Sequence, residues 1–405
     1  MLILIPHITH RVSYTFRVIF ERILNTTVTF TTNINDFTVS TEPKLAYSPI
    51  EVRTPIWIEA TALLFEEGVV KQSIDEEKWE DVTLFFPTKR GCFPVDIFAV
   101  IFFLISRYEE YYDDHLLDRH GRFQCQNSVA YQLGWHRKLM VHRLAFSLGA
   151  IIKEHYPQFE YRTPPFEEFF THDVDIAYQY KGKTWWGWCA AVAKALLQGR
   201  FTHAQNFLKV AMGKELVDPF DRYEPENGKN KPIYFIHTAP RGKYDKNIST
   251  KGKVFRDLIA KLKEYSEIGI HPSYHSSRKT FLIEKEKKRL EKIAQLTITK
   301  SRQHYLRFRF PDTFCALIKA GITDDYSLGW QDEAGFRASI AVPYPFFDLT
   351  KNEETTLILY PLAFMDCVFN KDEEKIVFNE LRDEVEKKGG VFIILTHNSN
   401  VQTIQ

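Results

Sequence analysis

The sequence lacks the cysteine pattern of a disulfide framework. Its five cysteines are odd in number and widely spaced, and they contain no Cys-x-x-Cys pair. This pattern disfavours both a disulfide-stapled secreted domain and a thiolate zinc site. A reducing, cytoplasmic location fits it best. The cysteines are Cys92, Cys125, Cys189, Cys315 and Cys367.

Long apolar runs and an excess of one charge are also missing. The longest apolar run, Ile97 to Ile105, is far shorter than the roughly 20 residues that span a bilayer, so no transmembrane segment is predicted. The first residues have no basic stretch ahead of their short apolar run, and we interpret them as a buried strand rather than a secretory signal. Lys and Arg (53) nearly balance Asp and Glu (52), which leaves no electrostatic footprint for nucleic acid.

The 405 residues are enough for two or three domains, and the pattern indicates two parts. Residues 1–165 carry no chemical motif and end in a Thr-Pro-Pro linker; they are predicted to form a smaller N-terminal α/β domain. Its predicted elements are strands over Leu2–Ile5 and Thr27–Thr32 and helices over Pro94–Tyr112 and Arg137–Glu154.

From residue 166 to 405, apolar strands alternate with charged helices. This rhythm predicts a mostly parallel α/β sheet, open or closed into a barrel. Such sheets collect reactive residues at the carboxyl ends of their strands. The predicted strands are Phe166–Asp173, Ile233–His237, Ile268–His271, Ile298–Phe308, Thr356–Tyr360 and Val391–His397, and the predicted helices are Val254–Glu267, Thr280–Leu296, Asp312–Ala320 and Asp372–Lys388.

The segment around 178–231 is too long for a simple connection between strands, and we predict a helical insertion there. It holds Trp185, Trp186 and Trp188, followed by an alanine-rich helix that ends near Gly199. Two interpretations stay open. The tryptophans of a helical hairpin could pack on the sheet, or the insertion could be a lid or a greasy surface that docks a lipid-linked or polymeric substrate.

The motif His271-Pro272-Ser273-Tyr274-His275 follows an apolar strand end directly. Pro272 suits the first position of a helical turn, and residues four apart on such a turn face the same way. His271 and His275 are therefore predicted to bind one cation. Two histidines with one carboxylate are a common catalytic zinc set that leaves a position open for water.

Two aspartates lie close together in Thr171-His172-Asp173-Val174-Asp175. In extended backbone Asp173 and Asp175 share one face, whereas His172 points away and is interpreted as structural. A cation would relieve the repulsion between the two carboxylates by holding one, while the other accepts a proton from water. The alternative is an Asp pair that caps the next helix.

A third histidine, His397, ends the apolar segment 391–397. An imidazole titrates near neutral pH, so His397 is a candidate general acid. The alternative is a hydrogen-bonded core histidine.

The fourth segment is Arg302-Gln303-His304-Tyr305. Arg302 beside the catalytic carboxylate would keep it ionised and oriented. The backbone amide near Tyr305 is a candidate oxyanion-hole donor. Without the other three segments, a surface arginine would be the default interpretation.

Together these four segments resemble the polysaccharide deacetylases of carbohydrate esterase family four, the NodB homology domain. The family motif Thr-Phe-Asp-Asp-Gly looks like residues 171–175, His-Ser/Thr-x-x-His like 271–275, Arg-x-Pro-Tyr like 302–305 and Leu-x-His like 395–397. The resemblance covers roughly residues 166–398, and the whole chain looks like deacetylase-related proteins of bacterial polysaccharide gene clusters. It implies a distorted (β/α) barrel, Zn²⁺ or another divalent transition metal, and removal of acetyl groups from N-acetylated sugars or glycans.

The resemblance also implies a role for each residue. Asp173 falls on the family's base, His397 on its general acid, and His271 and His275 on its two histidine ligands. Val174 stands where the family has its aspartate ligand, so either Asp175 supplies the metal carboxylate or Asp173 itself binds the metal.

Two further positions depart from the family pattern: Pro272 replaces Ser or Thr, and His304 replaces Pro. The fourth family motif, Asp-x-x-Asp-Trp, has only Asp325, Trp330 and Asp332 as candidates, at the wrong spacing.

The expected function is therefore metal-dependent deacetylation. Asp175, His271 and His275 would hold the metal, Asp173, Arg302 and His397 would be catalytic, and Tyr305 would serve the oxyanion. The expected partner is an N-acetylated sugar or glycan, without nucleic acid, and no oligomeric state is predicted. Two rivals are hydrolysis of another non-peptide carbon–nitrogen bond, such as a small amide or cyclic ureide, and a catalytically inactive glycan-binding homologue.

Overall fold

The structure is a computed structural model with a mixed α/β architecture, which confirms the predicted class. It describes residues 1–114, 116–221, 223, 230–368 and 371–398. Residues 222 and 224–229 of the predicted insertion, and residues 399–405, lie outside the described residues. No helix in the described part of the chain combines the length and the apolar character needed to cross a membrane.

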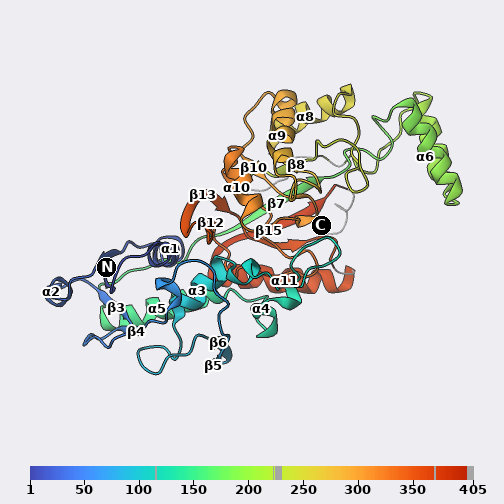
Figure 1. The fold of residues 1–405 in the computed structure, drawn as a ribbon. Helices are drawn as coiled ribbons and strands as arrows, with labels where there is room; N and C mark the ends of the chain where they lie inside the picture. The colour runs from blue at the N-terminus through green and yellow to red at the C-terminus, as the bar shows by residue number, and fades with distance from the viewer. Residues whose placement is uncertain (115, 222, 224–229, 369–370, 399–405) are drawn as a thin grey trace.

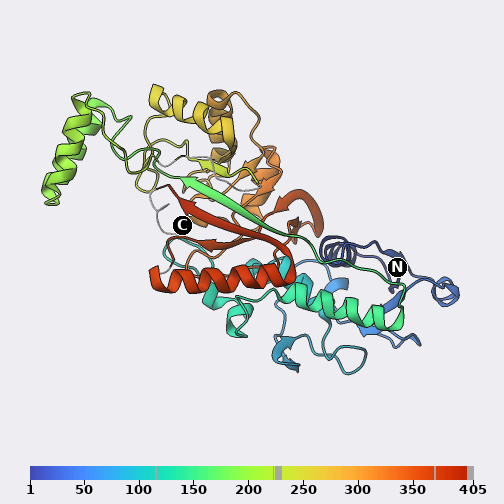
Figure 2. The same ribbon diagram turned by 180° about the vertical axis from the view of Figure 1, so that it is seen from behind.

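A curled nine-stranded sheet dominates the second part of the chain (Figures 1 and 2). All neighbouring strands run parallel except β12 and β13, which confirms the predicted, mostly parallel sheet. In spatial order the strands are β12 (Tyr344–Asp348), β13 (Glu353–Leu359), β11 (Asp324–Asp325), β10 (Lys300–Ser301), β9 (Glu267–Ile270), β8 (Ile233–Ile236), β7 (Phe166–Val174), β15 (Gly390–His397) and β14 (Leu362–Met365).

The register of the central strands brings the chemical motifs to one edge. β15 pairs with β7 along its whole length, so that His397 lies opposite Asp173. β8 pairs with β9 up to Ile270, and His271 follows at once. Gly269 in β9 permits this close packing, because a Cβ there would lie 2.5 Å from the Phe235 ring of β8.

The sheet does not close on itself. Within the described residues, the strand order ends at β12 on one side and at β14 on the other, and these two strands do not pair. The sheet is therefore open and curled, whereas the family resemblance implied a distorted barrel.

The helices that follow the strands agree closely with the predicted ranges. They are α8 (Lys253–Tyr265), α9 (Phe281–Ala294), α10 (Asp312–Lys319) and α11 (Lys371–Lys388). In Figures 1 and 2, α8 and α9 lie on one side of β7 and β15, and α11 lies on the other. α11 packs against β14 and β15, and α8 against β9.

The predicted strand over Ile298–Phe308 is wrong beyond its first residues. Only Lys300 and Ser301 pair with neighbouring strands, and the chain then leaves the sheet. A short 3-10 turn, η5 (His304–Leu306), follows, with positive φ at Tyr305 (65°) and Leu306 (48°). Backbone with positive φ cannot continue a strand. This turn carries two residues of the candidate site.

The first part of the chain forms a separate parallel sheet, drawn in blue in Figure 1. Its strand order is β2 (Thr29–Thr31), β1 (Leu2–Leu4), β3 (Lys44–Ser48) and β4 (Trp57–Glu59), and β5 (Glu76–Trp79) and β6 (Val82–Phe85) form a hairpin beside it. The other elements are α1 (His10–Arg17), η1 (Val18–Ile23), α2 (Ile34–Val39), η2 (Leu63–Phe65), α3 (Ile97–Ile105), η3 (Tyr108–Tyr111), η4 (Cys125–Asn127), α4 (Val129–Gln132) and α5 (Met140–His155).

The helix predicted over Pro94–Tyr112 begins later and ends earlier than expected. Asp96 is its N-cap and accepts hydrogen bonds from the amides of Phe98 and Ala99, which satisfies two donors of the first turn. Arg107, in the left-handed conformation at φ 54°, separates α3 from η3.

Buried contacts join the two parts of the chain. One apolar core cluster includes residues of both sheets, such as Ile3 and Ile236. A buried ionic network also crosses between them: Arg337 Nη2 lies 2.6 Å from Glu110 Oε2, and Arg107 Nε lies 2.8 Å from Glu110 Oε1. Both arginines and the carboxylate are nearly inaccessible to solvent. The two parts therefore fold against each other.

The predicted insertion contains a two-helix hairpin, α6 (Trp185–Leu197) and α7 (Phe201–Ala211), which projects from the body in both views (Figures 1 and 2). The prediction that the tryptophans of this hairpin pack on the sheet is wrong for two of the three. Trp185 and Trp186 are 65% and 79% exposed, and only Trp188 turns inward, where its indole N–H donates to the Tyr180 carbonyl at 3.1 Å.

Candidate metal centre

A small cavity of about 180 Å³ lies at the carboxyl ends of β7, β9, β14 and β15. Residues far apart in the sequence meet there because parallel strands end at the same edge of a sheet. The lining residues are Arg122, Asp173, Asp175, His271, His304, Tyr305, Leu306, Gln331, Met365, Cys367, Leu395 and His397.

Three of these residues form a compact set of metal-ligand types. Ligand atoms of Asp175, His271 and His304 all lie within 4.8 Å of one another. Asp175 Oδ1 is 3.1 Å from His271 Nε2 and 3.3 Å from His304 Nε2. Both imidazoles are buried, whereas the Asp175 side chain is 34% exposed and leaves the site open on one side.

Hydrogen bonds fix which nitrogen of each imidazole faces the centre. His271 Nδ1 lies 2.7 Å from the Arg302 carbonyl oxygen, which can only accept, so this nitrogen carries the proton. His304 Nδ1 lies 3.0 Å from Asp245 Oδ1 and donates to that carboxylate in the same way. Both Nε2 atoms are thereby directed at Asp175, in the arrangement that typically supports metal-binding histidines.

The spacing and the charges suit a divalent ion. Ligands about 2.0–2.2 Å from a common zinc ion are separated from each other by the kind of distance seen here. Burial opposes a charge on His304, but Asp175 and Asp245 raise its pKa to about 10. Burial likewise opposes a charge on Asp175, but His304 and His271 lower its pKa well below the usual value. Without an ion, protons provide the positive charge that this carboxylate requires, and metal binding would displace them.

His275, the predicted second histidine ligand, does not belong to this group and needs correction. It is exposed and does not line the cavity. The reason is the backbone: the chain after His271 forms a series of turns rather than an α-helix, so a spacing of four residues does not bring the two imidazoles together. His304 stands in its place. Its position in Arg302-Gln303-His304-Tyr305 had been noted only as a departure from the family pattern.

Asp173 lies beside the group and is held by Arg302. Arg302 Nη1 donates to Asp173 Oδ1 at 3.2 Å, and Arg302 Nε donates to the Tyr326 carbonyl at 3.0 Å. The guanidinium is fully buried and lies 4.5 Å from the centre of the Phe235 ring. Asp173 Oδ2 is 3.7 Å from His271 Nε2, farther than Asp175. Asp175 therefore lies closer than Asp173 to His271 Nε2 and is the better placed of the two carboxylates to bind a metal ion.

His397 approaches the cavity from β15 and is paired with Asp366. Its Nδ1 lies 2.7 Å from Asp366 Oδ1, and its backbone amide donates to Asp366 Oδ2 at 2.8 Å. Burial lowers the pKa of His397, but the Asp366 hydrogen bond and the charge of Asp175 outweigh it and raise the pKa to about 9. Asp366 was not predicted as a site residue, although it directly follows the apolar strand 362–365 and so lies at the carboxyl end of a strand like the others.

Tyr305 and Arg122 form another part of the wall. Tyr305, with its left-handed backbone, is 38% exposed. Arg122 Nη1 donates to the Tyr305 carbonyl at 2.7 Å, while its Nη2 pairs with Asp118 Oδ2 at 2.7 Å. Arg122 comes from the first part of the chain, where the sequence offered no chemical motif. That part therefore contributes to the candidate site.

Comparisons with known proteins add little to this geometry. Residues 1–157 match a family of unknown function (DUF7033). A candidate polysaccharide deacetylase of known structure from Mycobacterium smegmatis is similar over 58% of this chain and 78% of its own, with 13% sequence identity and a TM-score of 0.36. No curated protein matches the chain at a significant level. A likeness this distant assigns neither fold nor activity.

The remaining candidates from the sequence lie outside the cavity wall. Asp325 is buried and accepts hydrogen bonds from Ser301 and Ser327, and burial raises its pKa to about 6. Trp330 packs with Phe123 and Cys125, and Asp332 accepts from the Cys125 amide at 3.3 Å. His172 turns to the other face of β7, where Nδ1 lies 2.6 Å from Thr396 Oγ1.

Proposed function

We propose that this chain is a metal-dependent hydrolase that removes acetyl groups from an N-acetylated sugar or glycan. The observation that supports it most is the Asp175–His271–His304 group, with both imidazole Nε2 atoms directed at one carboxylate. Asp173 on one side and His397 beyond it supply a base and an acid within the same small cavity. In this proposal the curled sheet is an opened form of the deacetylase-type (β/α) barrel.

Residues 1–165 and 166–405 are, in the same proposal, two domains that share this site. The five cysteines are free, which supports the proposed reducing, cytoplasmic location.

The proposed chemistry divides the work among the residues of the cavity. Zn²⁺ or another divalent transition metal, held by Asp175, His271 and His304, would polarise the acetyl carbonyl and lower the pKa of a water molecule. Asp173 accepts the proton of that water as it attacks the carbonyl carbon. Arg302 orients the Asp173 carboxylate through the 3.2 Å hydrogen bond. The backbone amide of Tyr305 is the proposed donor to the oxyanion.

His397 then protonates the leaving amine. A general acid must carry its proton at the working pH, and the raised pKa of about 9 provides this near neutrality. Asp366 acts on His397 and not on the substrate: it orients the ring and stabilises the protonated form.

Metal removal tests the proposal directly. Purified protein is expected to hold about one equivalent of zinc or a similar ion and to release acetate from N-acetylated sugars or chitooligosaccharides. Dialysis against a chelator should abolish acetate release, and added Zn²⁺ should restore it. The measurements are elemental analysis and an acetate assay on the same samples.

The outcomes separate the proposal from its rivals. Bound metal without acetate release, together with release of ammonia or another amine from small amides or cyclic ureides, would favour a different carbon–nitrogen hydrolase. A protein that binds glycan but holds no metal would be an inactive homologue, and the proposal would be wrong.

A pH profile tests the role of Asp366. In the wild type, acetate release should persist below about pH 9 and fall above it, because His397 then loses its proton. Asp366→Asn removes a carboxylate in direct contact with this ring, so the alkaline limb should move to lower pH by about 1–3 pH units. Asp257→Asn, an exposed carboxylate on α8, is the matched control and should leave the profile in place. An unshifted limb in Asp366→Asn would contradict the assignment of His397 as the acid.

A further inference from the structure

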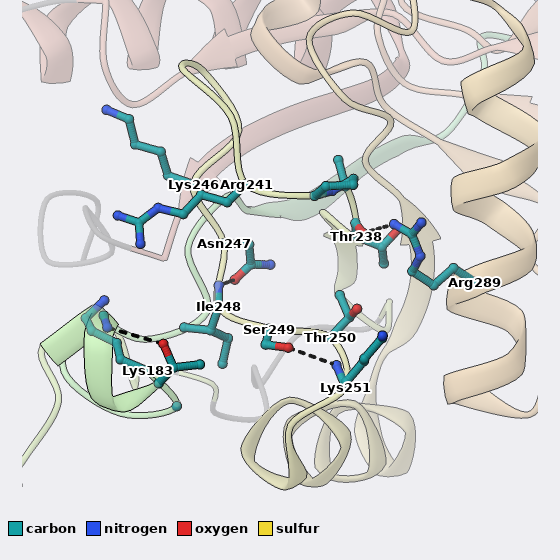
Figure 3. A pocket seen from close by; sticks show the side chains of 15 residues that line it. Lys183, Thr238, Arg241, Lys246, Asn247, Ile248, Ser249, Thr250, Lys251 and Arg289 are labelled. Carbon is teal, nitrogen blue, oxygen red and sulfur yellow. Dashed lines mark hydrogen bonds between the residues drawn. The ribbon is translucent and has the colours of Figure 1, made fainter. Parts of the chain in front are cut away.

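A second cavity, larger than that of the metal centre at about 470 Å³, is shown in Figure 3. Its walls come from the loop between β8 and α8, the segment that leads into α6, and one residue of α9. The lining residues are Gly182, Lys183, Thr184, Gly187, Thr238, Ala239, Pro240, Arg241, Lys246, Asn247, Ile248, Ser249, Thr250, Lys251 and Arg289. The proposed deacetylation mechanism uses none of these residues.

The charge of this lining is entirely positive. It contains the five cations Lys183, Arg241, Lys246, Lys251 and Arg289, and no Asp or Glu. Figure 3 shows the side chains of Lys183, Arg241 and Lys246 on one side of the cavity and those of Lys251 and Arg289 on the other. Over the described ranges of the chain, no ion pair of 4.0 Å or less joins any of the five to a carboxylate. In a chain with balanced overall charge, this is a local excess that an anionic ligand would neutralise.

The pKa of Lys183 reflects these surroundings. Burial lowers the pKa of its ammonium group, and the nearby Arg241 lowers it further, while Asp218 outside the lining opposes these effects. A bound anion would relieve both effects.

The backbone and the hydroxyl groups suit an anion of the phosphate class. The cavity lies at the N-terminal ends of α6 and α8, where backbone N–H groups and the helix dipole favour negative charge. Gly252 has no side chain with which to cap α8. Thr184, Ser249 and Thr250 add hydroxyl groups to the lining, whereas the Thr238 hydroxyl donates to the Glu286 carbonyl at 3.1 Å. Several cations, hydroxyls and helix N-termini around one cavity make up a typical phosphate site.

The wall is also well fixed. Asn247 donates to the His237 carbonyl at 2.7 Å and accepts from the amides of Ala177 and Ile248. Arg289 Nη1 donates to the Thr238 carbonyl at 2.5 Å, which ties α9 to the loop after β8. These hydrogen bonds hold the loop that lines the cavity.

The loop connects this cavity to the metal centre. The ring of His237, the first residue after β8, lies tilted beside that of His304, with ring centres 5.0 Å apart, and Asp245 accepts the hydrogen bond of His304 Nδ1. Thr238 to Arg241 and Lys246 to Lys251, on the same loop, line the basic cavity. The same loop therefore borders both cavities.

We propose that this cavity binds the phosphate or diphosphate group of the substrate, so that the acetylated sugar cleaved at the metal centre is a phosphate or diphosphate ester. This inference rests on the proposed function for the sugar, but its phosphate-binding part stands alone. The diphosphate can belong to a nucleotide sugar or to a lipid-linked sugar. Trp185 and Trp186 directly follow the lining residue Thr184 and are exposed, so an apolar lipid chain could contact them. The lipid-linked source is therefore tested separately.

Calorimetric titration with inorganic pyrophosphate tests the binding site. The protein is first freed of metal, because a metal ion would itself bind the probe. Wild type should bind with a Kd well below millimolar, and Lys183→Gln and Arg289→Gln should each weaken binding about tenfold, the usual loss for one charged contact. Lys261→Gln removes an exposed charge from α8 outside the cavity and should bind like wild type. Binding that is absent, or equal in all four proteins, would overturn the proposal.

The same titration distinguishes the two sources of diphosphate. Uridine diphosphate and farnesyl diphosphate carry one headgroup on a nucleoside and on an isoprenoid chain. Tighter binding of the first indicates a nucleotide sugar and of the second a lipid-linked sugar, and either result supports the site.

Acetate release then separates this inference from the proposed function. N-acetylglucosamine 1-phosphate should be cleaved with a KM at least tenfold below that of N-acetylglucosamine, and Lys183→Gln should remove this difference, whereas Lys261→Gln should keep it. Pyrophosphate binding without acetate release from either sugar would contradict the deacetylase proposal and keep the phosphate site. Equal KM values in the wild type would contradict the link between the two cavities.

Discussion

Asp173→Asn is expected to lower kcat for acetate release by about 10²–10⁴-fold while the zinc content stays at the wild-type level. The substitution keeps the shape of the side chain and a hydrogen-bond acceptor for Arg302, but it removes the basic oxygen that takes the proton of the attacking water. Asp175, His271 and His304 remain as ligands. Steady-state kinetics and elemental analysis on the same preparation measure the two effects.

The zinc content of this variant decides between the two roles left open by the sequence. If Asp173→Asn lost its zinc, Asp173 would be a metal ligand in spite of the longer distance, 3.7 Å, between its Oδ2 and His271 Nε2. Asp324→Asn, at the partly exposed end of β11, is a suitable control for the loss of one carboxylate. Activity within twofold of wild type in Asp173→Asn would rule out this residue as the base.

His304→Ala is expected to weaken zinc binding by more than about 100-fold, since even the loss of a supporting residue behind a ligand costs 10–100-fold. Its Nε2 lies 3.3 Å from Asp175 Oδ1, and no other described histidine is grouped with Asp175 and His271. Zinc affinity is measured by competition with a chromophoric chelator.

His275→Ala is the matched control, because it removes the histidine that the sequence favoured. Its exposed imidazole lies outside the cavity, and zinc affinity should match the wild type. The opposite pattern, with zinc lost in His275→Ala and retained in His304→Ala, would reinstate the ligand pair inferred from spacing alone.

These two histidines show why the site was only partly predictable. Asp173, His271 and His397 lie at or next to the carboxyl ends of strands, and in the sequence each follows a short apolar run. The i, i+4 argument for His275 assumed a helical turn, but the chain forms a succession of turns there. His304 reaches the centre only because the chain leaves the sheet after Ser301 and then takes up positive φ at Tyr305 and Leu306.

Residues from distant parts of the chain were harder still to foresee. Asp245 belongs to a loop, and its contact with His304 depends on how that loop folds back over the strand ends. Arg122 reaches Tyr305 across 183 positions in the sequence. Composition and periodicity carry no information about such contacts. The helices α8 to α11 and the long strands β7 and β15, by contrast, were predicted to within a few residues, because their apolar spacing repeats over several turns or pairs.

The ionic network around Glu110 affects how the chain can be divided into fragments. Arg337 lies in the interior of the second part, yet its carboxylate partner belongs to the first. A fragment that began near residue 166 would separate this guanidinium from the Glu110 carboxylate and would also remove Arg122 from the cavity rim. The residues matched by the family of unknown function therefore share a buried ion pair and one cavity with the rest of the chain.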